Sequence, residues 1–437
     1  MFNRLILISF LILCCISLPL QVQADEADGV IVLENVLSEL VQTHDRIQAA
    51  ESALKSAEHM LGKAKGGWLP RVDVTAEGGH EDIDKPNADT SYNRNEQTFK
   101  VTQNVYDFGK TSGDIASYEN LVNEKQARLL RTKQEIILSG IVAYLNLIKQ
   151  REILYYVIKT EKSIKELSGM QEALVRKGAG LSYEELQVKG QLVGVQSRRV
   201  TAERELQKAK NNFKAVYGYF VNEDSIAKLQ LPASPVALIP ATLDEAIDKA
   251  VVNNPDLQEL QFVVERLRGV LQKNQSAFFP EFDLVLDGKR RENDDGLSGV
   301  RWENRATMAM NYNLFSGMSD TEAVKAAKQD IISAKKQQLN QRRTVEENVR
   351  NAWVELLTLR KNVELYDNQS SITWEFLGLV KKKKAMGADV NLLDILVGER
   401  DYINSVSAKV EAEVETIIAS YKLLQAMGII SVESTKS

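Results

Sequence analysis

The sequence predicts a mainly α-helical protein with a small amount of membrane-type β-structure, arranged as two tandem copies of one structural unit. Three observations predict this class. The chain repeats itself with an offset of about 209 residues. Each copy contains a helical stretch far longer than an ordinary globular helix. Each copy also contains two segments of about ten residues in which apolar and polar side chains alternate.

The first residues have the composition of an export signal. Arg4 precedes a short apolar run and a small-residue cleavage site that ends at Ala24. A membrane anchor is the alternative, but it requires a longer apolar run, of about twenty residues. We therefore expect residues 1–24 to be a signal peptide. Cys14 and Cys15 lie inside it, so the mature chain is expected to contain neither a disulfide nor a thiolate metal site.

Composition argues against several classes of protein. The chain has 55 Lys and Arg against 60 Asp and Glu, a net charge of −5, which argues against a nucleic-acid partner. Beyond the signal, the sequence contains no apolar run of about twenty residues, so no helix is expected to cross a membrane. It also contains no phosphate-binding loop, so nucleotide hydrolysis is not expected here.

The two copies correspond at five places, in the same order along the chain. The matching segments are Trp68–Asp73 with Phe278–Asp283, Val105–Gly109 with Asn313–Gly317, Ala143–Leu145 with Ala352–Val354, Lys177–Ala179 with Met386–Ala388, and Val216–Gly218 with Ala426–Gly428. This correspondence predicts a first repeat at 25–230, a proline-rich linker at 231–241, a second repeat at 242–428 and a C-terminal tail at 429–437.

Each repeat begins with helix and continues with two strands. In the first repeat the apolar periodicity predicts one helix from Leu33 to Lys65, ended by the glycines that follow it. Strands are expected at 69–81, 96–107, 281–292 and 301–315. One face of these strands is apolar. Its members are Val72, Val74, Ala76, Gly78, Phe99, Val101, Val105, Phe282, Leu284, Leu286, Ala306, Met308, Met310 and Tyr312.

A long helix follows the strands in each repeat, and a turn and a second helix follow it. In the second repeat the long helix is expected from Asp320 to about Ala385, which at 1.5 Å per residue is on the order of 100 Å. No proline interrupts it. Spacings of four and three predict coiled-coil seams of Val345, Val349, Ala352, Leu356, Leu359, Val363 and Tyr366, and of Val410, Val414, Ile417, Tyr421 and Leu424. Tip turns are expected at about 177–182 and 386–391.

The strands allow two interpretations. A small water-soluble sheet packed on the helices is one, but it would leave open edges and an uncovered apolar face. A membrane barrel is the other, because about ten alternating residues match a tilted transmembrane strand. Four strands cannot close a barrel, so several chains would share it. The export signal, the repeat and the absence of thiols in the mature chain favour the barrel.

At this point the chain resembles the TolC family of outer-membrane channel-tunnels, over essentially its whole mature length. The resemblance rests on the duplication, on Tyr106-Asp107-Phe108-Gly109 and Leu314-Phe315-Ser316-Gly317 before the long helices, on Gly387 with Leu392-Leu393-Asp394-Ile395-Leu396, and on Tyr421–Gly428. It implies a homotrimer with a 12-stranded outer-membrane β-barrel and a 12-helix periplasmic α-barrel. It also implies a location in the Gram-negative outer membrane, extending into the periplasm.

The resemblance further implies acidic residues around the closed periplasmic aperture. Asp394 falls in that motif, and Asp389 is a second candidate, whereas Val397 stands where many relatives have a second acid. A carboxylate at a helix start is also favoured by the helix dipole alone. Both interpretations of Asp394 are kept.

Relatives contact a periplasmic adaptor through the tip turns, which makes Gly178, Gly180, Gly387 and Lys384 candidates for that contact. Lys384 ends a basic run, Lys381–Lys384, that the helix dipole would also favour. The strand-to-helix motifs place Tyr106, Gly109, Phe315 and Gly317 at the junction of barrel and tunnel.

The sequence shows no catalytic constellation, and neither an enzyme nor a cofactor is expected. The three histidines are scattered; His44 and His59 are expected on helix surfaces and His80 at a strand end.

The leading hypothesis is a passive exit duct of a tripartite export system, with an adaptor and an inner-membrane ABC transporter or proton-driven pump as partners. The motifs around Asp394 and Tyr421 resemble most the branch that serves type I protein secretion. Multidrug or metal efflux is the alternative. A periplasmic coiled-coil scaffold without a pore is the alternative of another class.

Overall fold

The computed structural model describes residues 32–435 except 85, 87–88 and 388–389. The predicted signal peptide and Asp389 therefore lie outside the described residues. The helices are α1 (Leu33–Thr43), α2 (Asp45–Lys65), α3 (Lys110–Arg176), α4 (Ser182–Tyr217), α5 (Glu223–Ala227), α6 (Leu243–Asn253), α7 (Pro255–Ser276), α8 (Ser319–Ala385) and α9 (Leu392–Ala426). The strands are β1 (Arg71–Ile83), β2 (Thr90–Tyr106), β3 (Glu281–Glu292) and β4 (Val300–Asn311). Three short 3₁₀ turns are Gly66–Trp68, Val236–Leu238 and Glu433–Thr435.

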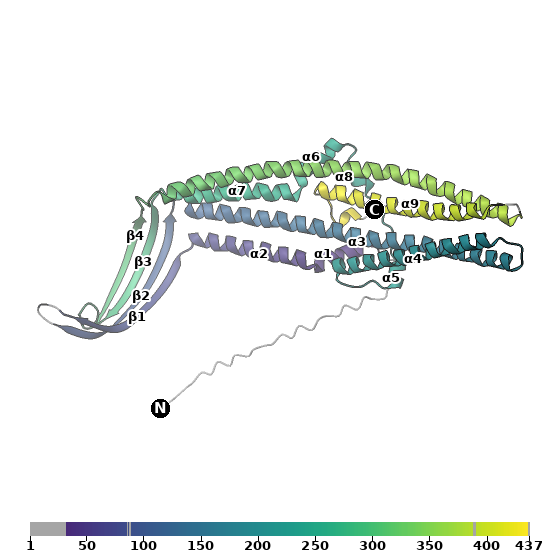
Figure 1. The fold of residues 1–437 in the computed structure, drawn as a ribbon. Helices are drawn as coiled ribbons and strands as arrows, with labels where there is room; N and C mark the ends of the chain where they lie inside the picture. The colour runs from purple at the N-terminus through teal and green to yellow at the C-terminus, as the bar shows by residue number, and fades with distance from the viewer. Residues whose placement is uncertain (1–31, 85, 87–88, 388–389, 436–437) are drawn as a thin grey trace, which may run out of the picture.

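The predicted tandem repeat is confirmed. The order α1-α2-β1-β2-α3-α4 is repeated as α6-α7-β3-β4-α8-α9, and the long helices α3 and α8 have 67 residues each. The elements form an elongated molecule with the sheet at one end and the two helix tips at the other (Figure 1). No described helix is both long enough and apolar enough to span a bilayer.

The prediction of one continuous helix from Leu33 to Lys65 is wrong. The chain becomes extended at His44, with ψ 125°, and its Nδ1 accepts a hydrogen bond from Arg46 N at 3.1 Å, which caps α2. His44 therefore lies between two helices, not on a helix surface. Asn254 has the same role between α6 and α7, where its Oδ1 accepts from Asp256 N at 3.0 Å. A side-chain acceptor at this position satisfies one of the free N–H groups that begin a helix.

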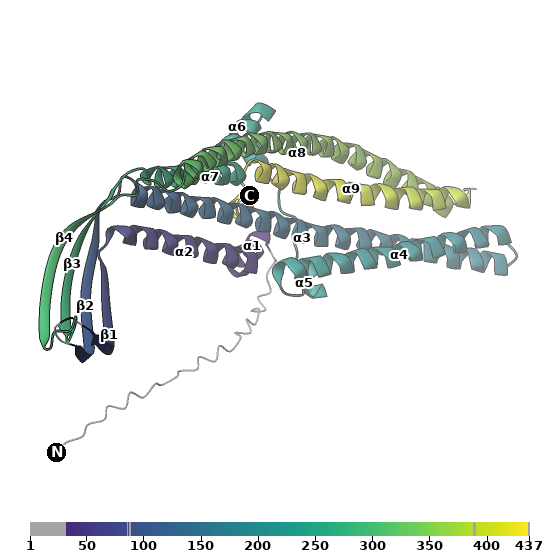
Figure 2. The same ribbon diagram turned by 60° about the vertical axis from the view of Figure 1, so that its left-hand side comes forward.

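The helices lie side by side in one layer. α3 packs against α2 and α4 on one side and against α7 and α9 on the other, and α8 packs against α7 and α9. The order across the layer is therefore α2 with α4, then α3, then α7 with α9, then α8, as Figures 1 and 2 also show. The lateral edges of the layer are α2 with α4 on one side and α8 on the other.

The predicted seams lie where helices meet. Val345, Val349, Ala352 and Leu356 are buried on α8, and all five predicted seam residues of α9 are buried. Near the sheet, α3 and α7 approach closely through glycine. A Cβ added to Gly269 would lie only 2.6 Å from the Ser117 backbone nitrogen, so only glycine fits this helix crossing.

The four strands form one antiparallel sheet in the order β1-β2-β3-β4. Its register aligns Val72 with Val101, Val101 with Leu286, and Leu286 with Ala306, so most of the predicted apolar side chains share one face. Two do not fit: a register shift at Val105 places Tyr106 opposite Phe282 instead, and Tyr312 lies beyond the end of β4. Among the described strands, β1 and β4 each have one neighbour, so both edges of the sheet are open.

The strand bounds differ in part from the prediction. Pairing continues to Ile83 on β1 and resumes at Thr90 on β2, so both strands are longer at this end than predicted. The sequence did not indicate this because the residues there are mostly polar and the alternation of apolar and polar side chains is lost. His80 therefore lies within β1, opposite Asn93, and not at a strand end. β4 ends at Asn311, so the predicted last four residues, 312–315, are not strand.

Candidate functional site

The predicted site residues lie at two places, the junction between sheet and helices and the tips of the helical hairpins. The two places are at opposite ends of the long helices (Figure 1). At the junction the strands lead into the long helices, and at the tips each long helix is followed by a turn and a returning helix.

At the first junction, Tyr106 ends β2 and Gly109 precedes α3 with φ 101°, a left-handed conformation that favours glycine. Asp107, between them, is only 1% exposed. Its carboxylate accepts hydrogen bonds from Thr111 N at 2.8 Å, Gly109 N at 3.2 Å and Asn104 Nδ2 at 3.1 Å. It therefore holds the start of α3 in a fixed direction relative to β2. Sequence analysis did not assign this role, although an acid just before a helix is a known capping signal.

An aromatic cluster surrounds this turn. The ring of Phe108 lies 4.6 Å from that of Tyr106, 5.0 Å from that of Phe279 and 6.5 Å from that of Phe282, measured between centroids. Tyr106 is 53% exposed, so the cluster remains on the surface of the single chain. Aromatic side chains gather where a membrane barrel meets the aqueous phase.

At the second junction, too, the residues before the long helix have a left-handed backbone conformation. Gly317 and Met318 both have positive φ, 65° and 69°, and Met318 precedes the first residue of α8. Phe315 is 77% exposed and directed away from the described core. The structure thus places Tyr106 at the end of a strand and the other three predicted junction residues, Gly109, Phe315 and Gly317, between a strand and a long helix.

The tip turns need glycine for two different reasons. Gly178 and Gly387 follow α3 and α8 with φ 71° and 78°, and Gly178 N donates to Val175 O at 2.9 Å. Gly180 lies close to the helix it leaves, because an added Cβ would be 2.9 Å from Val175 N. The two tips lie at the same end of the molecule (Figure 1).

The charged tip residues are placed as follows. Asp394 is exposed in the first turn of α9, where Asn391 Oδ1 caps the helix by accepting from Leu393 N at 2.9 Å. Lys384 is half-buried in the last turn of α8. An acid in the first turn of a helix and a base in the last turn both interact favourably with the helix dipole. The side chain of Asp394 is also accessible to solvent in the single chain.

A buried acid near the tips was missed by sequence analysis. Glu399 on α9 is 3% exposed, accepts a hydrogen bond from Ser163 Oγ on α3, and forms an ion pair with Lys381 on α8. These contacts join the two helical hairpins. Lys381 belongs to the predicted basic run, so part of that run has a partner inside the chain. The sequence signal is weak: one acid within an otherwise apolar face of a helix.

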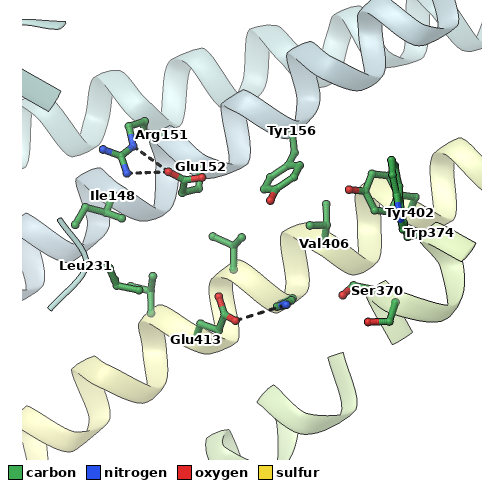
Figure 3. A pocket seen from close by; sticks show the side chains of 14 residues that line it. Ile148, Arg151, Glu152, Tyr156, Leu231, Ser370, Trp374, Tyr402, Val406 and Glu413 are labelled. Atoms are coloured by element: carbon green, nitrogen blue, oxygen red, sulfur yellow. Dashed lines mark hydrogen bonds and ion pairs between the residues drawn. The ribbon is translucent and has the colours of Figure 1, made fainter. Parts of the chain in front are cut away.

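A groove of about 470 Å³ separates α3 from the α8–α9 hairpin closer to the middle of the helices (Figure 3). Tyr156 from α3 points into it, and the rings of Trp374 and Tyr402 lie 4.9 Å apart at one end. Burial raises the pKa of the Glu413 carboxyl. The positive charge of Lys409 lowers this pKa, and the negative charge of Asp367 raises it further, so that the net shift is upward.

Within the described residues there is no group of three or more His, Cys, Asp or Glu side chains that could hold a metal ion. The arrangement of the molecule is that of a long helical layer attached to an amphipathic sheet with open edges.

Comparison with known proteins is decisive on the family. The family model "Outer membrane efflux protein" matches residues 36–219 and 246–429, one match in each repeat. The chain belongs to the outer membrane efflux protein family. Its location is therefore the outer membrane, and its family is one of channel proteins that export material from the cell. This sets aside the soluble periplasmic scaffold.

Similar proteins agree with this membership. The outer membrane efflux protein BepC of Brucella suis biovar 1 (strain 1330) is 20% identical over 333 residues, covering 75% of this chain and 71% of that protein. A membrane protein from Pseudomonas aeruginosa has the same fold, with a TM-score of 0.78 at 16% identity over 92% of this chain and 91% of that one. The outer-membrane channel OprN matches with a TM-score of 0.78 at 16% identity, over 91% and 89%.

Proposed function

We propose that three copies of this efflux-family chain close one barrel and one helical tunnel, and so form a passive exit duct through the outer membrane. The observation that carries the proposal is the sheet, which has one apolar face, one polar face and two open edges in the described chain. In lipid, strand edges must be paired, which a closed barrel achieves. The apolar face would then contact lipid and the polar face would line the pore.

The number of copies follows from the size of the pore. Two copies would give eight strands, and the interior of an eight-stranded barrel is filled by side chains. Three copies give twelve strands, with room for a channel. The trimer that the family resemblance implies is therefore also the smallest assembly of this sheet that can conduct.

The edges of the helical layer support the same closure. Exposed apolar residues recur every seven residues on the outer side of α8, at Leu365, Ile372 and Leu379, and once more at Met386, directly after the last residue of α8; we call these four the α8 stripe. A second series lies on α4 at Leu186, Val193 and Val200, the α4 stripe. Seven-residue apolar spacing favours helix-to-helix contact. The α8 stripe of one copy would therefore pack on the α4 stripe of the next.

The tips would form the periplasmic end of this duct. Three copies of Asp394 would surround its axis and concentrate negative charge there. Gly178, Gly180, Gly387 and Lys384 would contact a periplasmic adaptor. An inner-membrane ABC transporter or proton-driven pump would supply the energy, because the chain itself contains no nucleotide-binding motif.

For the cargo, we propose proteins delivered by type I secretion, supported by the motifs around Asp394 and Tyr421. Small-molecule efflux is the second candidate, and the similarity to an efflux protein, BepC, favours it. A deletion strain distinguishes them. Loss of a secreted protein from the culture medium, restored by the intact gene, supports secretion. Unchanged secretion with increased sensitivity to drugs or metal ions would replace it by efflux.

A further inference from the structure

The loop between β3 and β4 has a fixed and unusual shape. It comprises residues 293–299 at the end of the sheet away from the helices (Figure 2). Asn293, Asp295, Gly296 and Gly299 all have positive φ. Leu297 N donates to Asp294 O at 3.2 Å and Asn293 N donates to Gly299 O at 3.0 Å, so the loop forms a compact turn.

Asp294 fastens this loop to three strands. Its carboxylate lies 2.6 Å from Arg94 Nε on β2, 3.4 Å from Arg291 Nε on β3 and 3.6 Å from Arg301 Nη2 on β4. The side chain is 11% exposed, although it belongs to a loop. Glu96 lies 2.5 Å from Arg94 and 3.6 Å from Arg291, so the arginines are themselves held in place.

The loop lies on the polar face of the sheet. Glu96 and Arg291 are direct partners in the register, as are Arg291 and Arg301, so all three point to one face. That face is opposite the one that carries Leu286 and Met308, because successive strand residues alternate. The loop reaches as far as the first strand, where Gly296 N donates to Glu81 Oε2 at 3.2 Å. It thus crosses the sheet from β3 and β4 to β1.

We propose that this loop is an inward-folded flap which narrows the outer mouth of the channel, and that the contacts of Asp294 with the three arginines hold it closed. The inference rests on the proposed trimer, in which the polar face lines the pore. Twelve strands about 4.8 Å apart and tilted by about 40° give a barrel roughly 24 Å wide. One packed layer of chain adds about 10 Å to a wall. Three flaps would reduce the passage to a width that small molecules can pass and a bulky polymer cannot.

The test measures the access of reagents from outside the cell to a cysteine below the flap. The predicted mature chain has no cysteine, so Thr75→Cys gives one reactive thiol on the polar face, on the helix side of the flap. Intact cells receive either a small charged maleimide or a bulky polymer-linked maleimide. The rates are compared in three backgrounds that carry the same cysteine: native loop, Asp294→Asn and Glu292→Gln.

Glu292→Gln is the matched control, because Glu292 also pairs with an arginine, Arg290 at 2.9 Å, but on the opposite face. We expect Asp294→Asn to increase labelling by the bulky reagent roughly tenfold, the factor that loss of a few partly exposed ion pairs produces. Labelling by the small reagent should not change, and Glu292→Gln should change neither rate. A second variant, in which residues 293–299 are replaced by an Asn-Gly turn, should label as fast as Asp294→Asn or faster.

Equal rates for the bulky reagent in the native, Asp294→Asn and shortened-loop backgrounds, with normal labelling by the small one, would overturn the flap and leave the duct intact. A different result would overturn the duct itself. If neither reagent labels Thr75→Cys on intact cells in any background, the shortened loop included, although the thiol reacts after solubilisation, the polar face is not a pore open to the outside.

Discussion

Replacing Ile372 by asparagine tests the contact between neighbouring copies. Ile372 is 67% exposed in the single chain and lies in the middle of the α8 stripe. Full burial of an isoleucine side chain stabilises by about 1.5–3 kcal/mol, so burial of the exposed two thirds contributes roughly 1–2 kcal/mol for each contact. A closed ring of three has three such contacts. Ile372→Asn should therefore destabilise the assembly by roughly 3–6 kcal/mol.

The fold of each chain should be nearly unaffected, because a substitution at an exposed site usually changes stability by less than about 0.5 kcal/mol. The assay is the fraction of heat-sensitive trimer on a semi-native gel after extraction from outer membranes, with helical circular dichroism to check the fold. Ile158→Asn is the matched control. Ile158 is 49% exposed but lies on α3, which has helices of its own chain on both sides.

We expect a large loss of trimer for Ile372→Asn and none for Ile158→Asn. An equal trimer fraction in both variants would refute the assignment of the α8 stripe to the contact between copies.

Four further predictions concern single positions. Met308→Arg on the apolar face should cost roughly 2–4 kcal/mol near mid-membrane and reduce outer-membrane trimer, and wild-type levels would contradict the face assignment. Gly269→Ala should lower the melting temperature through a clash with Ser117 N worth about 1–3 kcal/mol, whereas no change would show that α3 and α7 can separate freely. Asp394→Asn should weaken block by trivalent cations in planar bilayers, and an unchanged blocking concentration would leave Asp394 a helix-start residue only. The raised pKa of Glu413 means that its ionisation destabilises the fold as pH rises through that pKa; Glu413→Gln should therefore raise the melting temperature at pH 7 and not at low pH, and a lower value at pH 7 would contradict this.

The long elements could be predicted because the information that specifies them is local. The structure begins α8 at Ser319 and ends it at Ala385, within one residue of the prediction. A seven-residue spacing is visible in any window of a few turns, and the alternating strand face is visible in six or seven residues. Both patterns directly report which side of an element is apolar.

What sequence analysis missed depends on partners distant in the chain. The partner that buried Glu399 accepts from, Ser163, lies 236 residues earlier in the chain, and Asp294 meets Arg94 from 200 residues away. No local window contains such pairs. The break at His44 is a different case: the residue has weak capping preference, and the apolar periodicity continues through it, so a single helix was the natural prediction.

The central claim is that three copies share one barrel, and the mass of the native particle tests it most directly. Protein extracted from outer membranes in a mild detergent can be measured by native mass spectrometry after the detergent is removed in the gas phase. The account predicts a particle of three mature chains, which dissociates to single chains on heating. A particle of one or two chains, carrying no other barrel-forming subunit, would contradict it, because four or eight strands cannot enclose a channel.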